Sequence, residues 1–199
     1  MISGAHDCIC RFVLGAAIAV AALGCAHAED TLSAADVMAQ MREVHESSAH
    51  FTERRTMAML SAPLETRGTL RYEAPDMLVK HTLQPRQEKF TVRGDRLTVV
   101  EGRDRLRSLS LSDQPQIGAL VESIRATLSG NLETLERYYT VAVTGTLDAW
   151  TLDLTPRDED LAAFVTLIEI TGAGAAIRTV DTRESNGDRS VMTVFEDRS

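Results

Sequence analysis

The chain has 199 residues and carries 29 acidic side chains against 21 basic ones, which gives a formal net charge of −8 at pH 7. An acidic surface repels nucleic-acid phosphates and anionic lipid headgroups, so we expect no nucleic-acid partner. The length is sufficient for one domain with a sound hydrophobic core.

The N-terminal segment has the composition of an export signal. Arg11 precedes an almost unbroken apolar run at residues 12–24, which is too short to span a bilayer stably. The tripeptide at residues 26–28 supplies the small residues that signal peptidase requires. We therefore expect residues 1–28 to be a signal peptide, and the mature chain to begin near Glu29 in the periplasm.

The cysteines fall in the same segment. Cleavage after residue 28 removes Cys8, Cys10 and Cys25, so we expect a mature chain with no thiol and no disulfide. A second interpretation reads residues 23–25 as a lipobox, in which Cys25 becomes acylated and anchors the protein. An uncleaved membrane anchor is a third alternative.

The first element after the signal is predicted to be a helix. Ser33 and Asp36 have the spacing of a capping box. Apolar residues then recur at helical spacing, at Val37, Met38, Met41 and Val44. We expect this helix to run to about Ser48.

A meander of strands is predicted to follow. From Phe51 the apolar period changes to that of strands, and turn signals recur about every eight to twelve residues. These signals lie at residues 61–63, 75–76, 85, 94–95 and 102–104. Runs such as 68–74 and 96–100 alternate or are rich in β-branched residues, which predicts antiparallel pairing.

A helical insertion at about residues 113–138 interrupts the meander. Ser112 or Asp113 is expected to cap its first helix, Pro115 falls in the first turn, and Gly130 ends it. A shorter helix is expected at about residues 131–138. Apolar residues of the first helix recur at helical spacing, at Ile117, Leu120, Val121, Ile124 and Leu128.

Strand signals resume after the insertion. They cover residues 139–146, 149–155, 164–171, 176–185 and 189–195. Asn186-Gly187 predicts a hairpin, residues 172–174 predict another turn, and the acidic run at 158–160 is interpreted as a solvated turn. The pattern predicts one mainly β (α+β) domain over residues 29–199, with about ten or eleven antiparallel strands.

A strongly twisted sheet of this size tends to curl, and a few helices cannot cover both of its faces. We therefore expect an unclosed half-barrel whose concave face lies under the inserted helices, which act as a lid. The residues expected to line an apolar ligand cavity there are Leu70, Tyr72, Phe90, Val92, Leu97, Val99, Ile117, Leu120, Val121, Ile124 and Leu128. The same pattern also fits a plain core in which helix and sheet pack tightly.

Several motifs, in order and spacing, resemble the LolA family of periplasmic carriers. They are Phe-Thr-Glu at 51–53, Gly-Thr-Leu-Arg-Tyr-Glu-Ala-Pro at 68–75 with Pro85 beyond it, Arg-Gly-Asp-Arg-Leu at 93–97, Leu-Asp-Leu-Thr-Pro at 152–156 and Asn-Gly-Asp-Arg-Ser at 186–190. The resemblance implies an unclosed barrel with a helical lid. It also implies a monomer that takes acylated lipoprotein from an inner-membrane donor complex and releases it to an outer-membrane acceptor.

Two departures from the family leave alternatives open. Ala74 stands where the lipoprotein carriers have an arginine that holds the lid over the empty cavity. Few residues follow Phe195, where those carriers continue into a further strand. A LolA-related carrier of a different lipid, such as a glycolipid or polyene lipid, and a non-catalytic lipid-sensing domain are therefore alternatives to lipoprotein carriage.

Motifs for catalysis are absent from the sequence. The histidines that remain after cleavage are His45, His50 and His81, and we expect the first two on or just past the first helix, without a carboxylate at ligand spacing. Nucleophile elbows, phosphate-binding glycine loops and Ser-x-x-Lys pairs do not occur. We expect a binding protein with no enzyme activity, no cofactor and no metal.

Overall fold

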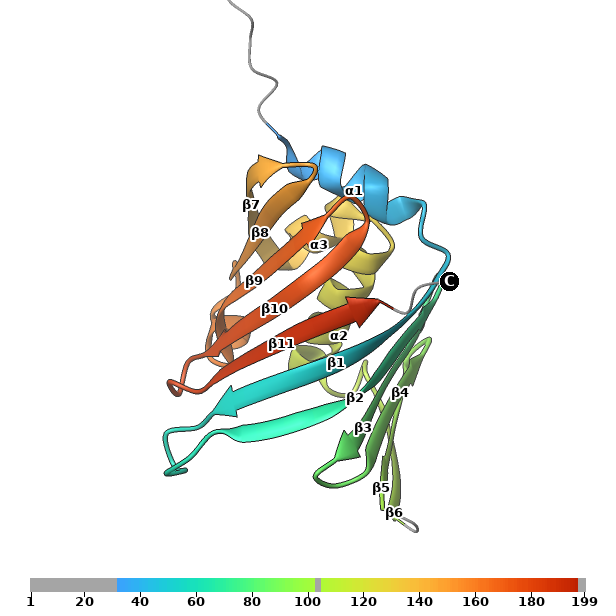
Figure 1. The fold of residues 1–199 in the computed structure, drawn as a ribbon, viewed down its shortest axis with the longest axis vertical. Coiled ribbons are helices and arrows are strands. Elements are labelled where there is room, and N and C mark those ends of the chain that lie inside the picture. The colour runs from blue at the N-terminus through green and yellow to red at the C-terminus, as the bar shows by residue number, and fades with distance from the viewer. Residues whose placement is uncertain (1–31, 103–104, 197–199) are drawn as a thin grey trace, which may run out of the picture. The chain divides into compact units, whose positions relative to one another are not determined.

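The computed structural model describes residues 32–102 and 105–196, so the predicted signal peptide and Cys25 lie outside the described residues. Within these ranges, eleven strands form one antiparallel sheet and four helices accompany it (Figure 1). The strand order is β6-β5-β4-β3-β2-β1-β11-β10-β9-β8-β7. Strands β6 and β7 are the two edges of the described sheet, so it does not close, and the predicted half-barrel fold class is confirmed.

The strands follow the predicted turns closely. They are β1 (Glu46–Thr56), β2 (Leu64–Glu73), β3 (Met77–Gln84), β4 (Glu88–Arg93), β5 (Arg96–Glu101), β6 (Arg105–Ser110), β7 (Tyr139–Thr146), β8 (Ala149–Pro156), β9 (Val165–Ala173), β10 (Ala176–Glu184) and β11 (Arg189–Glu196). The helices are α1 (Ala34–Arg42), α2 (Pro115–Leu128), α3 (Leu132–Tyr138) and α4 (Glu159–Ala162). In Figure 1, α2 and α3 lie on one side of the sheet, behind β9 to β11 and β1.

Helix α1 has the predicted start and an earlier end. The Asp36 amide donates to Ser33 Oγ at 3.2 Å, and the Ser33 amide donates to Asp36 Oδ2 at 2.9 Å, which completes the capping box. The predicted extension to Ser48 is wrong, because β1 begins at Glu46 and pairs with both β2 and β11. The ladder bonds of a central strand, and the burial of Ala49 within it, outweigh the helical spacing. His45 and His50 are consequently not helical; His50 lies on β1.

The inserted helices form as predicted, with a different first cap. Gln114 precedes α2 and makes no side-chain capping bond. Neither Ser112 nor Asp113 is the cap, because the helix begins after Gln114, and the Ser112 hydroxyl instead donates to Asp95 Oδ2 at 3.2 Å. Gly130, with φ of 65°, ends α2, and Asn131 caps α3 by accepting from the Thr134 amide at 3.0 Å.

The acidic run at 158–160 is exposed, as predicted, but it forms the start of a one-turn helix, α4, instead of a plain turn. Asp158 caps α4 by accepting from the Asp160 amide at 2.7 Å. Leu161 is 3% exposed and packs into the core. Burial of this single leucine therefore orders a segment whose acidic side chains remain exposed.

Apolar side chains on the helix side of the sheet gather in two clusters. The large cluster comprises Val37, Met38, Met41, Ala119, Ala126, Leu135, Tyr139, Trp150, Leu152, Leu154, Leu161, Val165, Ile168 and Ile170. The small cluster comprises Val92, Leu97, Leu111 and Val121, with Leu78, Phe90, Val99 and Leu109 packed against it. The core is therefore divided between the β7–β10 end of the sheet and the β3–β6 end.

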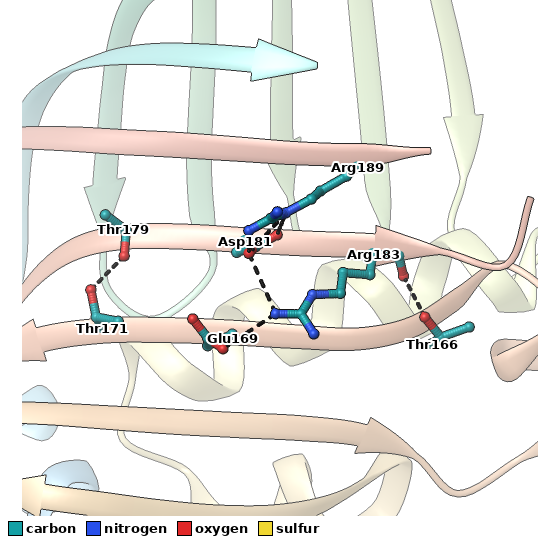
Figure 2. A network of polar contacts seen from close by, with 7 residues as sticks. All are labelled: Thr166, Glu169, Thr171, Thr179, Asp181, Arg183 and Arg189. Atoms are coloured by element: carbon teal, nitrogen blue, oxygen red, sulfur yellow. Dashed lines mark hydrogen bonds and ion pairs between the residues drawn. The ribbon is translucent and has the colours of Figure 1, made fainter. Parts of the chain in front are cut away.

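The opposite side of β9, β10 and β11 carries a polar network (Figure 2). Arg189 donates to both carboxylate oxygens of Asp181, with Nε to Oδ1 at 2.9 Å, and Arg183 lies within ion-pair distance of Asp181 and Glu169. The Asp181 side chain is only 7% exposed because these arginines cover it. Charge pairs thus cross-link three adjacent strands on the face away from the helices.

Candidate functional site

Residues directly opposite each other across an antiparallel ladder point to the same side of the sheet. One such row crosses six strands from β8 to β2, through Leu152, Ile170, Val180, Met192, Glu53 and Thr66. Leu152 and Ile170 are buried with Val37 and Met38 of α1, so the row points toward the helices. We call this helix-side surface of the sheet the inner face.

Helix α2 connects the two ends of the inner face. Val121 packs in the small cluster with Val92 of β4 and Leu97 of β5. Ala119 and Ala126 are buried in the large cluster, with residues of β8 and β9. Because one helix contacts both apolar clusters, displacing α2 would expose apolar surface at both ends of the inner face.

The predicted cavity residues lie on the inner face and on one stripe of α2. Phe90, Val92, Leu97, Val99 and Val121 meet in or against the small cluster, whereas Leu120 packs against the large cluster. Leu70 and Tyr72 share the inner face, because their cross-strand partners Lys80 and Leu78 lie opposite Phe90 and Val92. Leu70, Tyr72, Ile117, Ile124 and Leu128 belong to neither cluster.

Burial separates these residues into two groups. Tyr72, Val92, Leu97 and Val121 are at most 9% exposed and act as core. Leu70, Phe90, Val99, Leu120 and Leu128 are half-buried. Ile117 and Ile124 are 37% and 51% exposed, so α2 keeps an uncovered apolar stripe. The apolar surface available to a ligand therefore comes from the second group and from these two isoleucines.

Two clefts border α2, with volumes of about 560 and 410 Å³. Glu122 and Arg125 line both of them. Neither cleft is lined mainly by apolar side chains, since polar residues such as Arg42 and Asp95 contribute to their walls. A hydrocarbon chain would therefore have to use the half-exposed apolar surface, or space that opens when α2 moves.

Arg125 ties α2 to two turns of the sheet. Its Nη2 donates to the main-chain oxygen of Asp76 at 3.1 Å and to the main-chain oxygen of Gly94. Its Nη1 forms an ion pair with Glu122 Oε1 at 2.6 Å. The side chain is only 11% exposed, so the guanidinium is fixed by charge-assisted bonds in a partly desolvated position.

The same turns are bonded to each other and to the start of α2. Asp76 Oδ2 accepts from the Gly94 amide at 2.9 Å, which joins the β2–β3 turn to the β4–β5 turn. Asp95 accepts from the Ser110 hydroxyl and from the amide and hydroxyl of Ser112. The hydrogen bond from Ser110, followed by those from Ser112, lowers the pKa of Asp95. The segment leading into α2 is thereby anchored.

Helix α1 holds the other end of α2. Arg42 donates to the Gly130 main-chain oxygen at 3.0 Å. A Cβ added to Gly130 would lie 2.1 Å from the main-chain oxygen of Met38, so this contact requires glycine. The Arg125 bonds fix the last turn of α2 to the sheet, in addition to the packing of Val121.

Toward the C-terminal end of β1 and the N-terminal end of β11, the inner face carries charged side chains. Glu53 accepts from Lys80 Nζ at 2.6 Å, from Ser190 Oγ at 2.6 Å and from Thr66 Oγ1 at 3.2 Å. Burial raises the pKa of Glu53, but the Lys80 charge and these hydrogen bonds outweigh it, so its pKa lies below the usual value. The Lys80 and Glu53 side chains are 30% and 17% exposed.

Sequence reasoning missed this charged end and the Arg125 contacts. The alternation of side chains that placed Leu70 and Phe90 on one face also places Lys80 and Glu53 there. The same alternation could therefore have revealed the charged end from the sequence. Arg125 lies four residues after Val121, at the margin of the apolar stripe. Its partners on the sheet, by contrast, are main-chain oxygens of distant turns, which leave no signal in residue type.

Among the described residues, no group of three or more His, Cys, Asp or Glu side chains is arranged to hold a metal. No helix in these ranges has the length and apolar character needed to cross a bilayer.

Comparisons with known proteins identify the family. The family described as outer membrane lipoprotein carrier protein LolA-like matches residues 26–195. A comparison with curated proteins gives no match. The solved structures that resemble this chain include a LolA superfamily protein from Nitrosomonas europaea, at 12% identity and a TM-score of 0.42, over 84% of this chain and 94% of that one.

Two more distant structures share similar coverage of this chain. A chain of the Pseudomonas aeruginosa MucA/MucB complex has 12% identity and a TM-score of 0.41, over 83% of this chain and 58% of that one. A DUF1329 family protein from Desulfovibrio piger has 9% identity and a TM-score of 0.33, over 81% and 89% of the two chains.

Proposed function

The chain belongs to the LolA-like family of outer membrane lipoprotein carrier proteins, and from this premise we propose that it is a periplasmic carrier for acyl chains. It binds the acyl chains of lipoproteins on the inner face beneath α2 and shuttles them from an inner-membrane donor complex to an outer-membrane acceptor. It acts as a monomer and performs no catalysis.

The uncovered apolar stripe of α2 is the observation that supports this proposal most directly. Ile117 and Ile124 are exposed, although Val121 on the same stripe is buried in the small cluster. Helix stripes of a plain core are normally covered along their length. An uncovered stripe beside a half-buried apolar sheet surface is what an acyl chain would complete.

The size of the hydrophobic effect is adequate for this role. Apolar burial contributes about 25 cal/mol per Å², so an acyl chain that buries a few hundred Å² gains several kcal/mol before the costs of association. The half-buried residues Leu70, Phe90 and Val99 offer that surface on the sheet. Affinity of this order permits both uptake and release.

Uptake requires α2 to move relative to the sheet. The helix is anchored near Ser112 by Asp95 and near Gly130 by Arg42, and Arg125 fixes its last turn to the turns at Asp76 and Gly94. Breaking the Arg125 bonds would allow the C-terminal part of α2 to lift its apolar stripe from the sheet. We propose that Arg125 takes the place of the strand arginine whose position is occupied here by Ala74.

A carrier of a different lipid is the second candidate function. The charged end of the inner face favours it, because a bare hydrocarbon chain has no polar group that could bind Glu53 or Lys80. A lipid with a polar headgroup would use both parts of the surface.

Cargo that co-purifies with the exported protein tests the proposal. The full chain is expressed in a Gram-negative host, the protein is purified from the periplasmic fraction, and organic extracts are analysed by mass spectrometry. We expect stoichiometric lipid or acylated protein. Protein that is empty on repeated purification and does not bind a fluorescent fatty-acyl probe would contradict carriage.

A further inference from the structure

The inner face is amphipathic, and we infer that its charged end binds the zwitterionic headgroup of a lipid, with a phosphate and an ammonium group, while the acyl chains lie toward α2. This inference rests on the proposed carrier function and adds the class of cargo. Three properties of the charged side chains support it: their position beside apolar residues, their partial exposure, and the equal number of cations and anions.

Apolar and charged side chains are direct neighbours on this surface. Lys80 lies opposite Leu70 on β2 and Phe90 on β4, and its Nζ is 5.1 Å from the centroid of the Phe51 ring. Phe51 is 1% exposed, whereas the Lys80 side chain keeps 30% exposure. The ammonium therefore stands at the boundary between the buried core and open surface, where the headgroup of a bound amphiphile would lie.

A second charge pair extends the same patch. Arg55 lies two residues beyond Glu53 on the same face of β1 and forms an ion pair with Glu184 Oε1 at 2.6 Å. The two side chains are 41% and 23% exposed. Arg55 Nε is buried without a hydrogen-bond partner, so the patch contains an unmet donor.

The charges of the patch balance. At the β4–β6 end of the inner face, the register places Glu101 between Arg105 and Glu88, and Arg107 opposite Val99. The cations on these rows are Lys80, Arg55, Arg105 and Arg107, and the anions are Glu53, Glu184, Glu88 and Glu101. An anionic headgroup could engage only the cations of this balanced patch and would leave their carboxylates without a partner, in a chain whose formal net charge is −8. A zwitterion offers its phosphate to Lys80 and Arg55 and its ammonium to Glu53 and Glu184.

The charge pairs are not explained by folding stability. Replacing a desolvated ion pair with apolar residues of similar size is often neutral or stabilising. If the inner face bound only hydrocarbon chains, apolar residues at positions 53 and 80 would suit it better. Such residues do occupy the neighbouring positions of the same row, at Met192 and Val180. Retained pairs point to recognition of matched charges.

Competition between soluble short-chain lipids tests the inference. The exported protein is loaded with a fluorescent fatty-acyl probe, which is displaced by dihexanoyl phosphatidylethanolamine, dihexanoyl phosphatidylglycerol or dihexanoylglycerol. We expect the zwitterionic lipid to compete about tenfold better than the other two, because one net charge-assisted hydrogen bond is of that order. Equal competition, or a preference for the anionic or the uncharged lipid, would overturn the inference while probe binding keeps carriage intact. Failure to bind the probe at all would overturn the proposed function instead.

A matched pair of double variants locates the preference. Glu53→Gln with Lys80→Gln removes an inner-face pair, and Glu46→Gln with Arg71→Gln removes an exposed pair whose two side chains are 61% and 52% exposed. The first variant should keep probe binding and lose the headgroup preference, whereas the second should keep both. A preference that survives the inner-face change would contradict the assignment of the patch.

Discussion

Arg125 of α2 donates to the main-chain oxygen of Asp76 at 3.1 Å, across 49 residues of sequence. The same guanidinium bonds Gly94 and pairs with Glu122. A side chain of the helical insertion is thus hydrogen-bonded to the main chain of two turns of the sheet. The acceptors are carbonyl groups, so residue changes in those turns leave the contact intact as long as the turns keep their conformation.

Arg125→Met is expected to loosen α2 and to lower the free energy of unfolding by about 1–3 kcal/mol, since the bonds are charge-assisted and partly desolvated. Hydrogen exchange should accelerate in α2 and the uptake rate of a fatty-acyl probe should rise. Arg137→Met is the control, because the Arg137–Glu133 pair on α3 is 63% and 85% exposed. Unchanged exchange in α2 would show that packing alone holds the helix.

Ile124→Asp should abolish binding of the fatty-acyl probe and change the free energy of unfolding by less than about 1 kcal/mol, because the side chain is already 51% exposed. Probe titration and chemical denaturation measure the two effects. Leu106→Asp, at a side chain that is 68% exposed on β6, is the matched control and should bind normally. Global unfolding of the Ile124 variant would instead support a plain core.

Glu53 should make stability depend on acid pH. Its folded-state pKa lies below the ordinary value, so its contribution is present above the unfolded-state pKa and is lost as the pH falls through the folded-state pKa. Glu53→Gln should therefore be less stable than the unmodified protein at pH 7, by about 1 kcal/mol. The difference should shrink below pH of about 4.

Denaturant midpoints measured between neutral and acid pH test this expectation. Glu65→Gln serves as the control, since the Glu65 side chain is 75% exposed and lies 3.9 Å from Arg54. A constant difference between the Glu53 variant and the unmodified protein at all pH values would contradict the role of its ionised form.

Gly172→Ala should destabilise the large cluster by about 3 kcal/mol through overpacking. An added Cβ would lie 2.1 Å from Trp150 Cζ2 and 2.4 Å from the Ala176 main-chain oxygen. Gly174→Ala, where no heavy atom lies within 4 Å but φ is 55°, should cost only about 1 kcal/mol. Thermal unfolding distinguishes the two, and equal stabilities would mean that the Trp150 ring has room to shift.

The mass of the exported protein tests the predicted processing. A mature chain that begins at Glu29 should appear in the periplasmic fraction with no added lipid mass. A species that begins at an acylated Cys25 and sediments with membranes would support the lipobox interpretation instead.

Most of the fold was predictable because the signals that set it are local. Turn residues such as Gly94 and Asn186-Gly187 mark chain reversals, and alternation between them assigns each side chain to a face. The errors arose where tertiary contacts override local preference. Pairing of β1 with β2 and β11 shortens α1, burial of Leu161 makes α4 helical, and Asp95 accepts the hydroxyl hydrogen bond of Ser112, which was predicted as a cap of α2.

The predicted binding site could be derived from the sequence only in part. Periodicity placed Leu70 and Phe90 on one face of the sheet and Ile124 on the apolar stripe of α2, but it could not rank their exposure, because exposure depends on what lies opposite. Whether these residues contact a ligand remains a prediction.

Periodicity, turn chemistry and charge are properties of neighbouring residues, so the sequence alone determined the meander, the helical insertion and the acidic character of the chain. Only the tertiary structure decided which residues fix α2 and which charges share the inner face. Arg125 meets Asp76 and Gly94, and Glu53 meets Lys80 and Ser190, through pairings between segments far apart in the chain. Such contacts follow from the curvature and register of the whole sheet, which no single segment encodes.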